Sequence, residues 1–272
     1  MSSCFAFASG KGGVGKSTIT ANLGAALSLS GAETVVVDAD IGLRSQDTFL
    51  SLENRVVYDL IDLVNGSCTL QQCLLTCDAF PRLRLLPAAQ FSRAKALDPK
   101  KFSKIIGSLR DSFAYILIDC PAGIERGLRN VLKAEVDEWV LIATPDDVSL
   151  RSAERAKQIM ESKNLNRPSL IVNRLDASLI RRGEMMKAET AAQVLDLPLL
   201  GEIPEDDMVY RSQLRRALCL QYDCEARNAI LRIASRIAGK TVPFPAYGCR
   251  RLPGFRMLHH KSMKEVMPID HH

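Results

Sequence analysis

The chain has 272 residues, of which 47% are hydrophobic and 25% charged, the composition of a soluble globular protein with a substantial core. Its formal net charge is only +5 and no dense block of Lys and Arg occurs before residue 250, which argues against a dedicated nucleic-acid surface. The longest apolar runs are too short to cross a bilayer, and residues 4–8 lead directly into a glycine-rich loop without room for a cleavable signal peptide. We therefore expect a cytoplasmic protein.

Short apolar runs rich in β-branched residues alternate with helical patterns, which indicates stacked βαβ units. The expected strands lie at about 4–8, 34–38, 83–87, 115–119, 138–143, 169–173 and 199–203. The expected helices lie near 16–30, 57–77, 98–112, 126–134, 149–163, 183–196, 206–217 and 224–238, and Gly31 and Gly66 are expected as C-terminal caps. The pattern predicts an α/β fold with a doubly wound, mostly parallel sheet flanked by helices, in a single domain over residues 1–240.

The stretch ASGKGGVGKST joins the first expected strand to the first expected helix. It matches the pattern G-x-x-x-x-G-K-[ST], in which backbone N–H groups surround phosphates, the lysine meets the β/γ oxygens and the hydroxyl binds Mg²⁺. A strand, a loop and a helix N-terminus form the setting that a phosphate site requires. We therefore expect a P-loop NTPase that binds ATP and Mg²⁺. Its expected nucleotide-binding residues are Gly10, Lys11, Gly12, Gly13, Val14, Gly15, Lys16, Ser17 and Thr18.

Acidic residues follow two other expected strands. Asp119 ends the apolar run YILID in the manner of a Walker B motif, while Asp38 ends TVVVD and Asp40 follows two residues later. In doubly wound sheets, ligand-binding residues gather at the carboxyl ends of the strands. We expect these carboxylates to lie beside the phosphate loop and to hold or orient a metal ion and the attacking water.

Together, KGGVGKS, DADIGLR and DCPAGIE resemble the deviant Walker A ATPases of the ParA–MinD family, and within it the branch that determines the septum site in bacterial cell division. The likeness runs from residue 4 to about residue 240 and includes RVVYDLIDLVNG, LLPAAQ and LGEIPEDD. The segments RVVYD and PAGIE separate this branch from the plasmid-partition and iron–sulfur carrier branches.

The resemblance implies an ATPase that forms a homodimer with ATP bound at the subunit interface. Lys11, a position that the general phosphate-loop pattern leaves free, would reach the phosphates held by the partner subunit, much as an arginine finger does. Lys11, Lys16 and Asp40 would be the catalytic residues, and Asp40 would orient the attacking water.

The resemblance also assigns the other site residues. Ser17, Asp38 and Asp119 would support Mg²⁺, the two carboxylates through its water shell. Asn173 would hydrogen-bond adenine, and the loop around Pro204 would pack against the base. Ser45 departs from the family, which usually shows Asn at this position.

The expected partners follow from the same resemblance: a division inhibitor of the MinC type, a topological regulator of the MinE type and an anionic membrane surface, with no specific nucleic acid. The protein would be peripheral on the cytoplasmic face of the inner membrane when ATP is bound. We expect residues 241–272 to form a separate tail with an amphipathic membrane-targeting helix at about 252–267, because apolar residues share one side of that helix.

Two other interpretations of the function remain open from the sequence. A DNA-segregation ATPase of the ParA type would bind non-specific DNA in a salt-dependent way. An iron–sulfur scaffold ATPase would use some of the eight cysteines, with Cys120 beside Asp119 as the best feature, although the spacings match no standard cluster motif. All four histidines lie in the last 14 residues, so histidine chemistry in the predicted domain is excluded.

Overall fold

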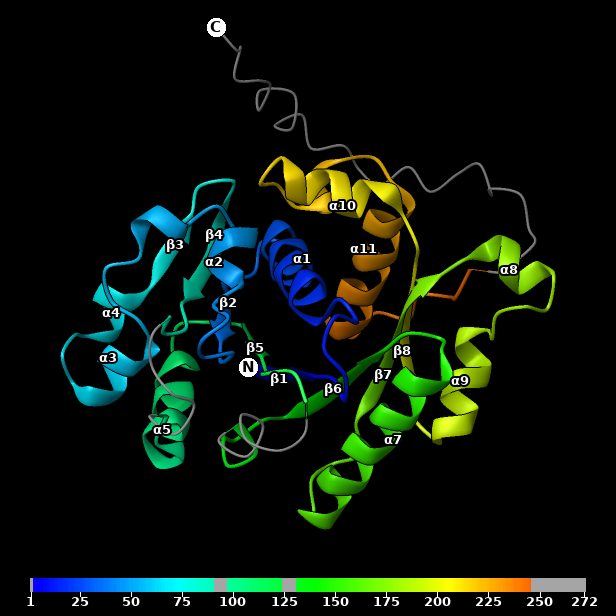
Figure 1. The fold of residues 1–272 in the computed structure, drawn as a ribbon. Helices are drawn as coiled ribbons and strands as arrows, with labels where there is room; N and C mark the ends of the chain where they lie inside the picture. Colours follow the sequence, from blue (N-terminus) through cyan, green and yellow to red (C-terminus); the bar gives the residue numbers. More distant parts are fainter. Residues whose placement is uncertain (1, 91–96, 124–130, 246–272) are drawn as a thin grey trace, which may run out of the picture.

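The computed structural model describes residues 2–90, 97–123 and 131–245 (Figure 1). Its centre is an eight-stranded sheet with the strand order β3-β4-β2-β5-β1-β6-β7-β8. All neighbouring strands pair in parallel except β3 and β4, which are antiparallel. The strands are β1 Ser3–Ala8, β2 Thr34–Asp38, β3 Leu75–Cys77, β4 Phe80–Leu86, β5 Tyr115–Asp119, β6 Glu138–Ala143, β7 Ser169–Leu175 and β8 Leu199–Pro204.

Helices connect the strands in the manner expected of crossover units. The α-helices of the described residues are α1 Lys16–Leu29, α2 Gln46–Phe49, α3 Leu60–Asn65, α4 Leu70–Cys73, α5 Pro99–Leu109, α7 Asp147–Ser162, α8 Ala177–Arg181, α9 Ala188–Leu195, α10 Asp207–Leu214 and α11 Glu225–Ile237. None of them is long and apolar enough to span a bilayer. The α/β architecture with a mostly parallel sheet is therefore as predicted.

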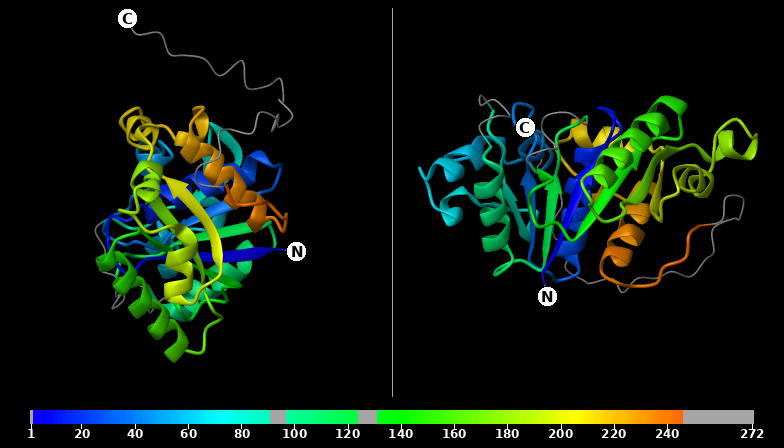
Figure 2. Two further views of the ribbon diagram at one scale, coloured as in Figure 1. Left: turned by 90° about the vertical axis from the view of Figure 1, so that its right-hand side faces the viewer. Right: turned by 90° about the horizontal axis from the view of Figure 1, so that it is seen from below.

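Helices cover both faces of the sheet, as the view from below in Figure 2 shows. Side chains of a strand alternate between the faces: Cys4 and Ala6 of β1 belong to one core cluster, and Phe5 and Phe7 belong to the other. The first cluster includes side chains of α5, α7 and α9, and the second includes side chains of α1 and α11. Because both faces are buried, the strands read as continuous apolar runs.

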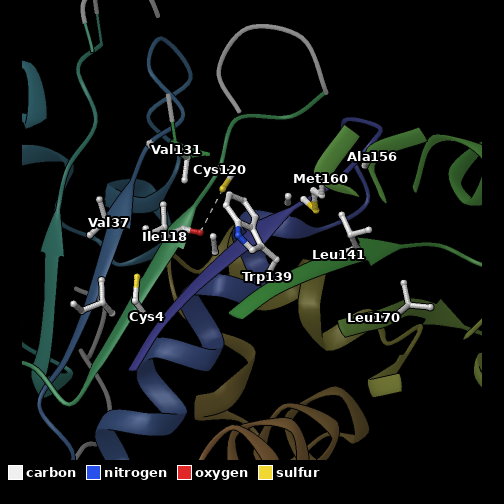
Figure 3. Packing of buried hydrophobic residues seen from close by; sticks show 14 of the residues in the cluster. Cys4, Val37, Ile118, Cys120, Val131, Trp139, Leu141, Ala156, Met160 and Leu170 are labelled. Atoms are coloured by element: carbon white, nitrogen blue, oxygen red, sulfur yellow. Dashed lines mark hydrogen bonds between the residues drawn. The ribbon is translucent and has the colours of Figure 1, made fainter. Parts of the chain in front are cut away.

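Trp139 lies at the middle of the first cluster and is 2% exposed. Figure 3 shows it beside Cys120, with Cys4, Ile118 and Val37 across the neighbouring strands. Both cysteines are fully buried. Burial raises the pKa of the Cys120 thiol, and it raises the pKa of Cys4 to about 12. These thiols therefore behave as small apolar core residues.

One expected helix, at 57–77, is wrong. The segment contains α3, α4 and the edge strand β3. Gly66 ends α3 with a φ of 79°, a left-handed conformation that glycine adopts without strain, and Thr69 caps the start of α4. The helical periodicity of the segment comes from the two short helices α3 and α4. The strand β3 forms because it can pair with β4 at the edge of the sheet.

The expected helix at 183–196 is also shorter than predicted. Its regular part is α9, and the residues before it form a turn around Gly183, which has a φ of 73°. The expected helix at 126–134 lies mostly outside the described residues. The cap predicted at Gly31 is confirmed, because Gly31 follows the last residues of α1 with a φ of 95°.

Candidate nucleotide-binding site

The glycine-rich loop runs from the end of β1 to the start of α1. It lies where the strand order reverses, because β2 to β5 lie on one side of β1 and β6 to β8 lie on the other. Gly13 and Gly15 have φ values of 82° and 93°, which strain any residue with a side chain. A Cβ atom on Gly10 would lie 2.0 Å from the carbonyl oxygen of Ser152 in α7, so this position has no space for a side chain. The loop thus leads into the N-terminus of α1, whose unpaired N–H groups and positive dipole end favour an anion.

Lys16, the first residue of α1, points into the interior of this site. It is 5% exposed, and its Nζ lies 2.5 Å from Oδ1 of Asp119 at the end of β5. Burial alone would lower the pKa of Lys16, but the charge and hydrogen bond of Asp119 outweigh it, so the pKa is raised. Lys16 therefore supplies a buried positive charge at the loop, paired with Asp119.

Asp38 joins this group because β2 and β5 are neighbours whose registers place Asp38 opposite Asp119. Asp38 is fully buried and accepts hydrogen bonds from the backbone N–H groups of Asp40 (3.0 Å) and Gln46 (3.1 Å). Burial, and next the charge of Asp119, raise the pKa of Asp38 well above its ordinary range. Two carboxylates thus share one buried lysine, an arrangement that further positive charge would stabilise.

Asp40 belongs to the same group and is 8% exposed, whereas Asp38 and Asp119 have no exposed surface. Burial raises its pKa, and Asp119 adds to the rise while Lys16 opposes it. The predicted gathering of Asp38, Asp40 and Asp119 beside the loop is therefore what the structure shows. In the described parts of the chain, no three His, Cys, Asp or Glu side chains form a metal-binding group, so these carboxylates by themselves do not make a closed metal cage.

Gln46 is a site residue that the sequence analysis missed. It is fully buried, and its side-chain Nε2 donates to Asp119 Oδ2 (2.7 Å) and to the backbone carbonyl of Ser17 (3.0 Å). Its side-chain Oε1 is buried and has no hydrogen-bond partner among the described residues. Nothing in the sequence marks it, because it lies eight residues beyond Asp38 in a segment that ends no strand.

Ser45, the residue next to Gln46, also has a buried hydroxyl oxygen without a hydrogen-bond partner in the described part of the chain. It precedes α2 but makes no side-chain cap there. Ser45, where the resemblance leads us to expect Asn, therefore has a buried polar atom that no described residue satisfies.

Asn173 and Pro204, predicted to contact the base, come from β7 and the end of β8. Asn173 is 9% exposed, and its amide nitrogen donates to the carbonyl of Val14 (2.8 Å). A Cβ atom on Gly15 would lie 2.5 Å from that nitrogen, so Asn173 packs directly against the loop. Pro204 pairs with Leu175 two residues further along β7. The adenine contacts of both residues stay predictions.

Lys11 is exposed, in contrast to Lys16. It borders a hollow of about 280 Å³ whose other walls are residues 12–14 of the loop and Thr144, Pro145, Asp146, Arg174 and Met185. Burial alone would raise the pKa of Asp146, but hydrogen bonds from Thr144 and Ser149 and the charge of Lys11 lower it. The two lysines of the loop thus have different surroundings: one is internal and one faces outward.

Thr144 and Asp146 were also missed, although the rule that found Asp119 could have found them. They follow β6, the strand on the other side of β1. Asp146 accepts a hydrogen bond from the hydroxyl of Thr144 and caps α7 by accepting from the N–H of Ser149 (3.0 Å).

The sequence model of one protein family, the CobQ/CobB/MinD/ParA nucleotide binding domain, matches residues 5–218 of the chain. The chain belongs to this MinD/ParA family. Its MinD/ParA relatives include the septum site-determining protein MinD of Helicobacter pylori, which is 41% identical over 251 residues, with 89% of this chain and 93% of the relative covered.

Two solved MinD/ParA structures resemble the fold. The MinC:MinD cell division protein complex of Aquifex aeolicus aligns with a TM-score of 0.84 and 34% identity over 90% of this chain and 99% of that chain. MinD of Pyrococcus horikoshii complexed with Mg-ADP aligns with a TM-score of 0.77 and 29% identity over 87% and 96% of the two chains. The family resemblance inferred from the sequence is confirmed.

The site of this MinD/ParA protein fits Mg²⁺ and a nucleotide on the evidence of its own atoms. The glycine loop leads into a helix N-terminus and borders a hollow, Lys16 supplies an internal positive charge, and two buried carboxylates lie beside it. The buried Gln46 Oε1 adds an acceptor that lacks a donor among the described residues. Each of these features is one that a bound magnesium nucleotide would satisfy.

Proposed function

We propose that the protein is an ATPase that dimerises with ATP, binds the inner membrane reversibly from the cytoplasm and positions the cell-division site by recruiting a septum inhibitor of the MinC type. The observation that carries this proposal is the pair of lysines on one phosphate loop, Lys16 buried against Asp119 and Lys11 exposed. A simple phosphate site needs the first lysine only. The likeness to MinD proteins, one of them in a complex with MinC, supports the cellular role.

In this proposal each residue near the loop has one task. Mg²⁺ supplies charge that neutralises the phosphates, and Ser17 would hold it, with Asp38 and Asp119 acting through water. Lys16 would leave Asp119 for the β/γ oxygens of the nucleotide. Asp40, which unlike Asp38 and Asp119 keeps some exposed surface, would orient the attacking water.

Lys11 would complete the site of the partner subunit. Its exposed position beside residues 144–146 lets it leave this subunit without breaking a buried contact. A charge that arrives only with the partner would make hydrolysis depend on dimerisation, as an arginine finger does in other nucleotide hydrolases. A MinE-type regulator would then act on the dimer.

Asp40→Ala is expected to keep ATP binding and dimerisation but to lower turnover about 100-fold, because water orientation is lost while Lys16 and the loop remain. Single-turnover hydrolysis and light scattering with ATP measure the two properties. As a control, Asp111→Ala removes an exposed carboxylate in the turn after α5 and is expected to change neither property. Turnover of Asp40→Ala within twofold of the wild type would show that Asp40 has only a structural role.

Membrane binding is proposed to reside in the tail, whose expected helix at 252–267 lies outside the described residues. The last described residues are fixed to the body, because Arg236 donates to the carbonyls of Val242 (3.0 Å) and Pro243 (3.1 Å). A single amphipathic segment gives marginal binding, but a dimer presents two, which raises avidity about 100-fold or more. ATP would therefore control membrane affinity through dimerisation.

Sedimentation with vesicles of anionic lipid tests this proposal with ATP and with ADP. The wild type is expected to sediment with ATP only. Removal of residues 246–272, which keeps the contacts of Arg236, and Phe255→Glu are both expected to abolish sedimentation while the ATP-dependent dimer persists. Unchanged sedimentation of either variant would show that the tail is not the anchor, and binding of DNA instead of vesicles would favour a ParA-type function.

A further inference from the structure

Gln46 joins three parts of the nucleotide site at one buried point. Its backbone N–H donates to Asp38 at the end of β2, and its side-chain nitrogen donates to Asp119 at the end of β5 and to the carbonyl of Ser17 in α1. No part of Gln46 is exposed. It is therefore placed to couple the segment after β2 to the residues expected around Mg²⁺.

The orientation of its amide group follows from these contacts. Both partners of the side chain, the Asp119 carboxylate and the Ser17 carbonyl, are acceptors, so the nitrogen must face them. The oxygen is then the atom left over. It is buried and has no hydrogen-bond partner among the described residues. A buried acceptor without a donor is unfavourable, and such atoms are uncommon in folded proteins unless a ligand or water completes them.

We propose that Gln46 is a positioning residue for the magnesium nucleotide: its nitrogen orients Asp119, and its Oε1 accepts a hydrogen bond from a water molecule bound to Mg²⁺. This inference rests on the proposed function, since it needs the metal to be held at Ser17. The group that donates to Gln46 Oε1 must be a water molecule or another neutral or cationic group. A phosphate oxygen is excluded, because Oε1 would repel its negative charge. The water shell of Mg²⁺ meets this requirement, since Mg²⁺ keeps several of its waters when it binds to proteins.

A positioning role of Gln46 predicts that its replacement changes the effect of Mg²⁺ on nucleotide binding, whereas a role in packing alone does not. Gln46→Leu fills a similar volume but removes both the donor and the acceptor. The Kd for ADP measured in EDTA is expected to stay within twofold of the wild-type value. The factor by which Mg²⁺ tightens ADP binding is expected to fall about tenfold, because one charge-assisted hydrogen bond is lost. Titration calorimetry with ADP, with and without Mg²⁺, measures both values.

Matched variants separate the alternatives. Gln213→Leu is the control, because Gln213 also donates to α1, at Thr18 Oγ1 (3.0 Å), and its hydrogen bonds among the described residues do not involve Asp119. It is expected to keep the wild-type factor for Mg²⁺. Gln46→Met, which is longer and more adaptable than leucine, repeats the measurement if Gln46→Leu does not fold.

Gln46→Glu keeps an acceptor oxygen but places a carboxylate beside Asp119. Its melting temperature is expected to fall without metal and to recover with Mg²⁺-ADP by more than that of the wild type. If Gln46→Leu and Gln46→Met weaken ADP binding equally with and without Mg²⁺, or not at all, Gln46 is a packing residue and the proposal is overturned. If Mg²⁺ does not tighten ADP binding by the wild type, the proposed function itself fails.

Discussion

Lys16→Ala is expected to weaken ATP and ADP binding by at least about 100-fold, since a charged contact to the phosphates is lost. The structure adds a second consequence. Lys16 is the buried cation paired with Asp119, so its removal leaves the fully buried Asp119 carboxylate without its counter-charge. Removing one partner of a buried ion pair costs about 3–5 kcal/mol of stability. We therefore expect a lower melting temperature even without nucleotide.

Two further variants separate the effects of Lys16→Ala. Asp119→Asn in addition to Lys16→Ala removes one buried charge and is expected to restore part of the melting temperature without restoring nucleotide binding. Lys163→Ala, at an exposed lysine just after α7, should change neither property. Binding is measured by calorimetry and stability by thermal unfolding. Nucleotide affinity within tenfold of the wild type in Lys16→Ala would contradict the assignment of this lysine to the phosphates.

Lys11→Ala is expected to keep monomer nucleotide binding but to lose the ATP-dependent dimer and about 10³–10⁵-fold of turnover, the range found for an arginine finger. Dimerisation and turnover are expected to fall because the partner's site would lack the charge that Lys11 supplies. The stability of the single subunit should change little, because Lys11 is exposed there and only borders the hollow next to Asp146. We expect the melting temperature to change by less than about 2 °C, the range of surface substitutions.

The test for Lys11 is light scattering and hydrolysis with ATP, with the melting temperature as the control for folding. Mixing Lys11→Ala with Asp40→Ala sharpens it, because a mixed dimer has one site with both an intact Asp40 and a Lys11 from its partner. Turnover should recover in the mixture above that of either variant alone. A normal dimer with normal turnover for Lys11→Ala would remove the cross-subunit role.

The candidate site could be predicted largely from the sequence because its parts are local. The glycine loop carries its own conformational requirements, and Asp38 and Asp119 end apolar runs whose carboxyl ends a parallel sheet brings to one edge. The strands of the central sheet were found for the same reason, since burial of both faces produces continuous apolar runs.

Features that depend on a neighbour were not predictable. The edge strand β3 is only three residues long and exists because β4 leaves an open edge. Gly10 fits the loop pattern, but its closeness to Ser152 is a property of how α7 packs. The amide of Asn173 reaches the Val14 carbonyl across 159 residues of sequence, which no local pattern records.

The sequence by itself determined the α/β class, the phosphate loop and the carboxylates at the strand ends, because turn chemistry and apolar periodicity are encoded over a few residues. The tertiary structure alone decided which of two loop lysines is internal and which is exposed, and it placed Gln46 against Asp119 and Ser17. Those outcomes depend on how strands order themselves in the sheet and which helices cover them. Burial and charge pairing are properties of that arrangement, since they arise only when segments distant in sequence exclude water from the same point.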